Sequence, residues 1–231
     1  MTKIDFTPML VSLKLSFWTT LLLFLIAFPV ALFLSFRKSK LTALLEPLIT
    51  LPLVLPPAVI GFYVLLLLSP RNFPGAFFDK FLDIRFVFRF SGILIASLIY
   101  SFPFMVQPLK NGIESINPQL LEASYILGKS RLETLLKIII PNIKPYILTG
   151  AVMTFAHTMG EFGVILIVGG NIPGKTKVAS IFIYESVEVL NYTTAHVYSL
   201  IMLCLSFLIL LTVNLAGRGS VNRSPGRRKE R

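Results

Sequence analysis

Long apolar stretches dominate the chain and are separated by short segments that carry most of its charges. A helix needs about 20 apolar residues to cross a bilayer. Five stretches reach or approach that length, and they cover roughly residues 10–36, 47–68, 92–109, 146–168 and 196–216. None shows the regular alternation of a membrane β-strand. The pattern predicts an all-α integral membrane protein with five transmembrane helices, in a membrane domain that covers residues 1–217.

Composition supports this prediction. Hydrophobic residues make up 55 % of the chain, charged residues only 14 %, and the mean hydropathy is +0.78. A soluble domain carries roughly 25 % charge, so an ordinary soluble enzyme is disfavoured. The first stretch is too long for a signal peptide and is expected to be a retained helix. The single cysteine, Cys204, rules out an intrachain disulfide and makes a cysteine-based metal site improbable.

The net charge of +11 is distributed unevenly along the chain. Five spans place the two termini on opposite sides, and the segments on the side of the C-terminus hold more Lys and Arg. Because such segments stay in the cytoplasm, we expect the N-terminus outside and the C-terminus inside. The basic tail, residues 218–231, is expected to be disordered. It is interpreted as a topology anchor on an anionic leaflet rather than as a nucleic-acid binding segment.

The longest inner loop, residues 117–141, predicts two short helices joined by a glycine. Asn117 suits an N-cap, Gly128 suits a left-handed helix end, and Ser130 with Glu133 forms a capping box. Pro141 is expected to break the second helix. Such an elbow with an apolar face either docks into a groove of another protein or lies on the bilayer surface; the physical pattern alone favours neither.

Residues at fixed spacing in this elbow resemble the EAA loop of bacterial ABC-importer permeases. The matching positions are Glu122, Ala123, Ser124, Gly128, Ile138 and Pro141, with serine in place of the second alanine. Four further stretches look like the molybdate permease branch of that family. They are Leu51 to Gly61, Ser101 to Val106, Met159 to Gly163 and Asn171 to Thr176.

The resemblance implies a type I ABC importer permease fold in a bacterial or archaeal cytoplasmic membrane. It implies a homodimer whose elbows dock on two cytoplasmic ATPase subunits, which bind ATP and Mg, and an extracytoplasmic binding protein that delivers molybdate. The chain itself would bind no cofactor or metal, would be no enzyme, and would translocate its substrate by alternating access. Tungstate and sulfate or thiosulfate are the alternative substrates. A membrane enzyme is disfavoured, because no recognisable acid–base or metal set is present.

Residues 169–176 fit the phosphate-binding pattern G-x-x-x-x-G-K-[ST]. That pattern requires a buried strand before it and a helix after it, whereas here an apolar span precedes it. We interpret the segment as a turn that ends the fourth span. Lys175 and Thr176 are then candidate contacts for the binding protein. The following segment, residues 178–190, predicts an outer interfacial helix.

Polar residues at membrane depth mark candidate pathway positions. Glu161 is the only carboxylate within an apolar span, and His157 precedes it by one helical turn. The pair predicts either a polar staple that orients the fourth helix or a proton relay. Pro56 and Pro57 predict a kinked second span, which either lines the pathway or merely bends for packing. The remaining pathway candidates are Ser101, Thr154 and Asn171.

Overall fold

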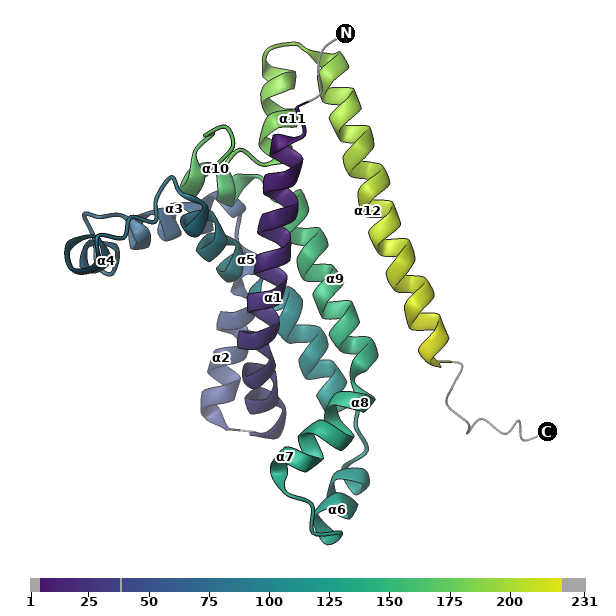
Figure 1. The fold of residues 1–231 in the computed structure, drawn as a ribbon. Coiled ribbons are helices and arrows are strands. Elements are labelled where there is room, and N and C mark those ends of the chain that lie inside the picture. Colours follow the sequence, from purple (N-terminus) through teal and green to yellow (C-terminus); the bar gives the residue numbers. More distant parts are fainter. Residues whose placement is uncertain (1–4, 38, 222–231) are drawn as a thin grey trace.

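The computed structural model describes residues 5–37 and 39–221, with side chains up to residue 212, and all regular structure in that part is helical (Figure 1). The helices in chain order are α1 (Thr7–Phe36), α2 (Lys40–Thr50), η1 (Leu51–Leu53), α3 (Pro57–Leu68), α4 (Gly75–Leu82), α5 (Phe90–Glu114), α6 (Pro118–Ile126), α7 (Arg131–Thr134), the π-helical η2 (Leu135–Ile139), α8 (Ile140–Asn142), α9 (Lys144–Gly160), α10 (Gly163–Gly169), α11 (Ala179–Glu188) and α12 (Tyr192–Val221). The predicted all-α class is confirmed.

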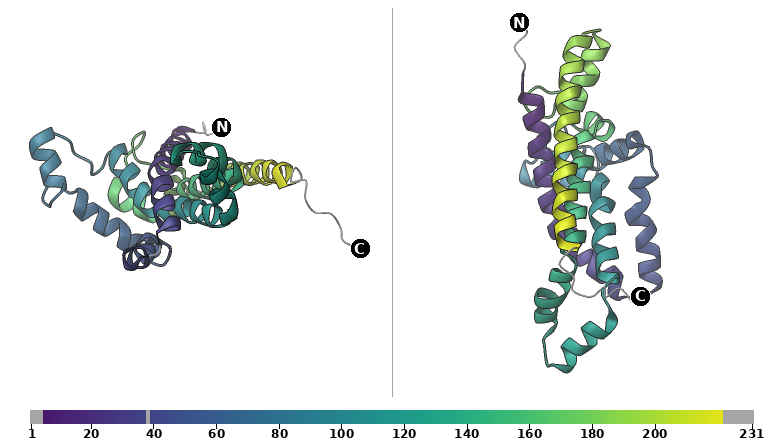
Figure 2. Two further views of the ribbon diagram at one scale, coloured as in Figure 1. Left: turned by 90° about the horizontal axis from the view of Figure 1, so that it is seen from below. Right: turned by 90° about the vertical axis from the view of Figure 1, so that its right-hand side faces the viewer.

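Three long helices, α1, α5 and α9, pack against one another and form the centre of the molecule (Figures 1 and 2). Small residues on α1, such as Ala27 and Ala31, are fully buried and allow close approach. A Cβ added to Gly112 of α5 would lie 2.7 Å from the Tyr146 side chain, so the α5–α9 contact requires glycine at this point. The core they share is lined by Leu23, Leu34, Met105, Val106, Leu109, Ile113, Ile139 and Ile143.

The second predicted span is not one kinked helix, which corrects the sequence interpretation. The helices α2 with η1 and α3 meet at an angle of 110°. The break lies at Leu55 and Pro56, directly before α3 begins at Pro57. Two successive prolines remove two backbone donors and clash with a preceding helical turn, so the helix cannot continue through them.

The fourth predicted span is also divided. The helix α9 ends at Gly160, Glu161 has extended backbone (φ −68°, ψ 139°), and α10 begins at Gly163. The two short helices that follow these breaks, α3 and α10, pack on each other and on α5. A Cβ on Gly163 would lie 3.0 Å from the Cβ of Pro57. The two breaks are therefore neighbours in space.

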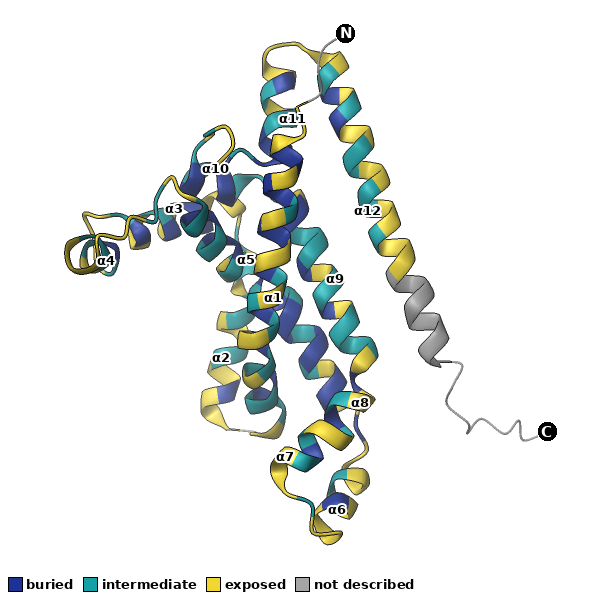
Figure 3. Ribbon diagram, in the orientation of Figure 1, coloured by how far each residue is buried: buried dark blue, intermediate teal, exposed yellow. Residues whose placement is uncertain are grey.

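Three continuous helices, α1, α5 and residues 192–212 of α12, are long and apolar enough to cross a membrane. Two bent pairs, α2–η1 with α3 and residues 131–142 with α9, raise that number to at most five within the described residues. Exposed positions are frequent along the outer helices (Figure 3), and they include apolar side chains such as Leu10, Phe17, Leu203 and Phe207. The predicted number of five spans equals this upper number, but the second bent pair joins residues 131–142 to α9, whereas the predicted fourth span runs from α9 into α10.

The helix α11 is docked on the bundle. Its first residue, Ala179, donates its backbone N–H to Ser12 Oγ of α1 over 2.8 Å, and Ile181 is buried. The helix α12 packs on α11 and α9. Its backbone continues to Val221, past the predicted boundary at residue 217, because extending an existing helix costs little. The rest of the predicted tail, residues 222–231, lies outside the described residues.

Candidate functional site

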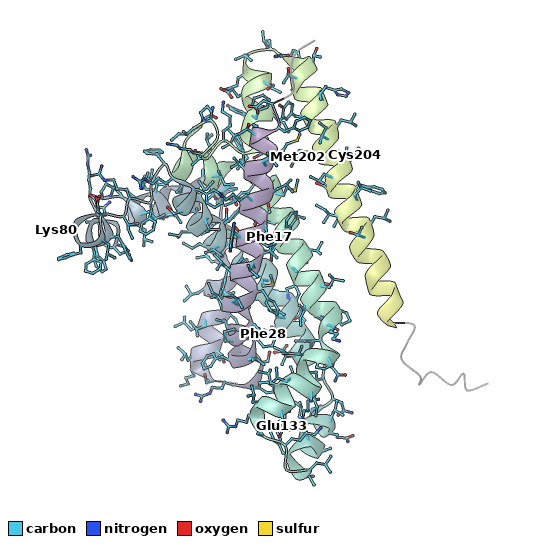
Figure 4. The ribbon with its side chains drawn as sticks, in the orientation of Figure 1. Phe17, Phe28, Lys80, Glu133, Met202 and Cys204 are labelled. Carbon is cyan, nitrogen blue, oxygen red and sulfur yellow. The ribbon has the colours of Figure 1, made fainter. Side chains whose placement is uncertain are left out.

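The elbow between α5 and α9 projects from one end of the three-helix centre, where Figure 4 labels Glu133. It consists of α6, α7, η2 and α8. Asn117 caps α6 by accepting the Gln119 N–H at 3.0 Å, as its position before a proline predicts. The predicted helix–glycine–helix arrangement is confirmed.

Gly128 forms the sharp turn of the elbow. Its φ of +73° is a conformation that costs a residue with a Cβ about 1–2 kcal/mol. The Lys129 N–H donates to the Ser124 carbonyl at 3.0 Å, which closes the end of α6 in the manner of a Schellman motif. Open space surrounds the missing side chain, so glycine is needed here for backbone conformation.

The EAA-like residues divide into two groups. Glu122 and Ala123 are exposed. Ser124 is buried, and its hydroxyl contacts Thr134 Oγ1 of α7 at 2.9 Å and donates to the Leu121 carbonyl at 2.8 Å. Ser124 therefore connects the two arms of the elbow, α6 and α7, on their inner side, while Glu122 and Ala123 face outward.

The second arm of the elbow begins at a capping box. The Ser130 hydroxyl accepts the Glu133 N–H, and Glu133 accepts the Ser130 N–H. Lys137 Nζ lies 2.9 Å from Glu133 Oε1. This ammonium and the Ser130 N–H lower the pKa of Glu133 below its usual value, so the carboxylate that caps the helix stays charged at neutral pH.

The second arm ends at Asn142, one residue after Pro141, and α9 follows at an angle of 70°, in agreement with the predicted break. The five residues before Ile140 adopt a π-helical turn, in which the Ile140 N–H bonds to the Leu135 carbonyl. This wider turn was not predicted. Ile138 is half-buried, whereas Pro141 is exposed.

The tip of the elbow is apolar and uncovered. Ile126 is 85 % exposed, Leu127 is 76 % exposed, and Tyr125 is also exposed. Contiguous apolar residues at an end of a molecule mark a protein or membrane contact. Together with the outward-facing Glu122, they form one surface on the end of the elbow.

A second polar cluster lies between α5 and α9. The Ser101 hydroxyl contacts His157 Nδ1 and Thr158 Oγ1, each at 3.0 Å. The imidazole stacks on Phe104 with ring centroids 3.9 Å apart. Ser97, one turn from Ser101, donates to Glu161 Oε2 at 3.3 Å. Sequence reasoning did not identify Ser97, although its spacing of four residues from Ser101 places both on one face of α5.

Glu161 and His157 do not partner each other, which corrects the sequence expectation. Glu161 lies beyond the end of α9, so the two residues do not share a helical face. Glu161 is 6 % exposed, its Oε1 has no partner, and its backbone carbonyl accepts the Ser180 hydroxyl of α11. No lysine, arginine or histidine pairs with it among the described residues. If Glu161 orients the end of α9, it does so through its hydrogen bonds to α5 and α11.

The other pathway candidates do not gather at one place. Pro56 and Pro57 are exposed at the α3 break, beside the break at Glu161. Thr154 is fully buried on α9, and its hydroxyl has no partner. Asn171 is exposed in the loop after α10. Only Ser101, His157 and Glu161 belong to the buried cluster between α5 and α9.

The loop at residues 169–176 is a self-contained turn. A helix, α10, precedes it. The backbone N–H groups of Lys175, Thr176 and Lys177 all donate to the Ile172 carbonyl, within 3.2 Å. The Thr176 hydroxyl is buried and donates to the Gly169 carbonyl at 2.7 Å. Several amides that would cradle a phosphate are therefore occupied within the loop, and the side chain of Thr176 is buried in this conformation. Lys175 is exposed.

Three charged residues at the elbow end of α5 form a cluster that sequence reasoning missed. Lys110 Nζ lies 3.2 Å from Glu46 Oε1 of α2 and 3.3 Å from Glu114 Oε1 of α5. The spacing of Lys110 and Glu114 by four residues is a signal for half of this cluster. The contact to α2 joins residues far apart in the chain and has no such signal.

Within the described residues, no group of three or more His, Cys, Asp or Glu side chains could hold a metal ion.

Comparisons with known proteins agree with this arrangement. Residues 10–221 match the family of the Binding-protein-dependent transport system inner membrane component. The Molybdenum transport system permease protein ModB of Azotobacter vinelandii is 38 % identical over 210 residues, which cover 90 % of this chain and 92 % of that protein. The Sulfate transport system permease protein CysT of Salmonella typhimurium is 33 % identical over 171 residues, covering 74 % of this chain and 61 % of that protein.

Among solved structures, a bacterial ABC transporter involved in the import of the acidic polysaccharide alginate aligns with a TM-score of 0.78. The alignment covers 94 % of this chain and 80 % of that chain at 19 % sequence identity. At this identity the likeness shows the fold, which is that of a type I ABC importer permease.

Proposed function

The chain belongs to the family of binding-protein-dependent transport system inner membrane components, and we propose that within this family it imports molybdate. The observation that carries the proposal is the identity of 38 % with a molybdenum permease over nearly the whole of both chains. A sulfate permease is 33 % identical over a shorter part. Sulfate and tungstate are therefore the second candidates, since these oxyanions share charge and shape with molybdate.

In the proposed assembly, two copies of the chain enclose the pathway, and the elbow of each docks on one of two ATPase subunits. The exposed Glu122 and the apolar tip at Ile126 and Leu127 form the docking surface. ATP and Mg bind to those subunits, and this chain supplies no ATPase chemistry. A binding protein outside the membrane delivers the oxyanion, with the exposed Lys175 as a candidate contact. The N-terminus lies outside and the C-terminus in the cytoplasm.

The proposed pathway runs beside the two helix breaks, at Pro56 and at Glu161. Non-helical backbone at membrane depth is tolerated where protein or water covers it. The helices α3 and α10 pack together, so they can shift as one body when the pathway switches sides. The carboxyl group of Glu161 disfavours tight binding of an oxyanion at the break. We propose a passage of low affinity, with selectivity residing in the binding protein.

The substrate is tested by uptake in proteoliposomes that contain this chain, its ATPase and its binding protein. Labelled molybdate is expected to accumulate on addition of ATP, and excess unlabelled tungstate is expected to compete. A tenfold excess of sulfate is expected to reduce uptake by less than about twofold, because a preference of about 1.4 kcal/mol for molybdate already gives a tenfold difference in affinity. Uptake of labelled sulfate that molybdate does not inhibit would assign the chain to sulfate transport instead.

A further inference from the structure

The charged cluster at the elbow end of α5 has a role in neither docking nor the pathway as described above. Lys110 is on α5, and its side chain is only 16 % exposed. A lysine shielded to this extent requires an anionic partner, because removing an unpaired ammonium from water is costly. It has two, Glu114 on its own helix and Glu46 on α2. Only the contact with Glu46 joins two helices.

The contact between Lys110 and Glu46 matters because α2 connects to both helix breaks. The helix packs on α5, and its residues Leu45 and Ile49 lie against the core that contains Ile113 and Ile116. At its far end, α2 leads through η1 into the 110° bend and α3. The helix α3 packs on α10, which follows the break at Glu161. A shift of α2 along α5 would therefore reach both breaks.

The other side of the cluster leads to the elbow. Two residues separate Glu114 from Asn117, the residue that caps α6. A cavity of about 490 Å³ lies between this end of α5, the end of α1 and α6, and Glu114, Ile116 and Leu121 line it. The helix α6 faces the end of α1 across this cavity. One route leads from the elbow through α8 and α9 to the break at Glu161. Another leads through the end of α5 and across the pair formed by Lys110 and Glu46 to the broken span of α2 and α3.

We propose that Lys110 is a positioning residue that fastens α2 to the elbow end of α5, so that a movement of the elbow displaces the broken span formed by α2 and α3. The inference rests on the proposed function, because it concerns how docking at the elbow is converted into opening of the pathway. Lys110 touches neither the ATPase surface nor the oxyanion in this account. Its effect is on how many oxyanions are transported for each ATP hydrolysed.

The cluster contains its own matched control. Glu46→Gln and Glu114→Gln each remove one of the two carboxylate charges that pair with Lys110. Only Glu46→Gln removes the ion pair that joins α2 to α5. Uptake of molybdate per ATP hydrolysed is measured in proteoliposomes and normalised to the amount of assembled transporter. Glu46→Gln is expected to lower this ratio about tenfold, within the range of typical coupling energies. Glu114→Gln is expected to change it by less than about twofold, as for an i,i+4 pair that joins no second helix.

Exchanging the charges of Glu46 and Lys110 distinguishes a specific link between α2 and α5 from a general loss of stability. Glu46→Lys and Lys110→Glu alone place like charges together and are expected to lower the ratio as Glu46→Gln does. The double variant, made in the Glu114→Gln background so that residue 110 meets no like charge, restores the pair in reverse and is expected to exceed either single variant in that background about fivefold. Equal effects of Glu46→Gln and Glu114→Gln, or a double variant no better than its singles, would overturn the inference. Absence of uptake by the unmodified chain would instead refute the proposed function.

Discussion

Replacing Glu122 by lysine is expected to reduce ATP-driven uptake about a hundredfold, which corresponds to a docking loss of about 3 kcal/mol. The Glu122 side chain is exposed on α6, and it makes no hydrogen bond or ion pair within the described residues. The substitution therefore leaves the elbow folded and changes only the surface that it presents. Co-purification of the ATPase with the permease, measured beside uptake, reports the docking step directly.

The matched control reverses a charge at the opposite end of the molecule. Glu188 is exposed near the end of α11, where its carboxylate accepts the Tyr184 hydroxyl at 2.7 Å. Glu188→Lys is expected to leave ATPase co-purification at the level of the unmodified chain. If Glu122→Lys retains full uptake and full co-purification, the elbow is not the docking surface, and a position on the bilayer surface becomes the better interpretation.

Truncation of Glu161 is expected to have the second largest effect. Glu161→Ala removes a buried side chain and leaves the Ser97 hydroxyl without its acceptor between α5 and the break. Together the cavity and the lost hydrogen bond cost about 2–4 kcal/mol. We expect less assembled permease in the membrane, and uptake at least about tenfold lower. Thermal stability in detergent, followed by size-exclusion chromatography, measures the structural part of this loss.

Glu161→Gln tests whether the hydrogen bond to Ser97 or the ionisable carboxyl group of Glu161 is required. Glutamine keeps the volume and an oxygen that can accept the Ser97 hydroxyl. Because no described cation pairs with Glu161, we expect this variant to retain stability and to keep uptake within about threefold of the original. A glutamine variant as defective as the alanine variant would show that an ionisable group is required, and a proton relay would then replace the staple.

The elbow could be predicted in detail because its signals are local. The cap at Asn117, the left-handed turn at Gly128 and the capping box at Ser130 each depend on residues within one or two turns. The end of the second arm near Pro141 also follows from a local signal, because proline forbids a regular α-helical hydrogen bond and the arm ends one residue later, at Asn142. The π-helical turn before it has no such signal in the sequence.

The membrane interior was less predictable, because its contacts join distant parts of the chain. Apolar length identified the spans but did not show that the second bends by 110° or that the fourth is interrupted at Glu161. That interruption moved Glu161 away from His157 and onto Ser97, 64 positions earlier in the chain. The pair of Lys110 and Glu46 could not be predicted either, because it also joins residues that lie far apart in the chain. Hydropathy cannot indicate which polar side chains on different helices will meet.

In the proposed function, this chain moves an oxyanion with energy received at its elbow. The most direct test is uptake into proteoliposomes that contain the chain, its ATPase and its binding protein, with ATP confined to one side. Labelled molybdate is predicted to accumulate only when the binding protein and ATP are on opposite sides and ATP is on the elbow side. Accumulation with ATP on the side of the binding protein, or equal accumulation without this chain, would contradict the account.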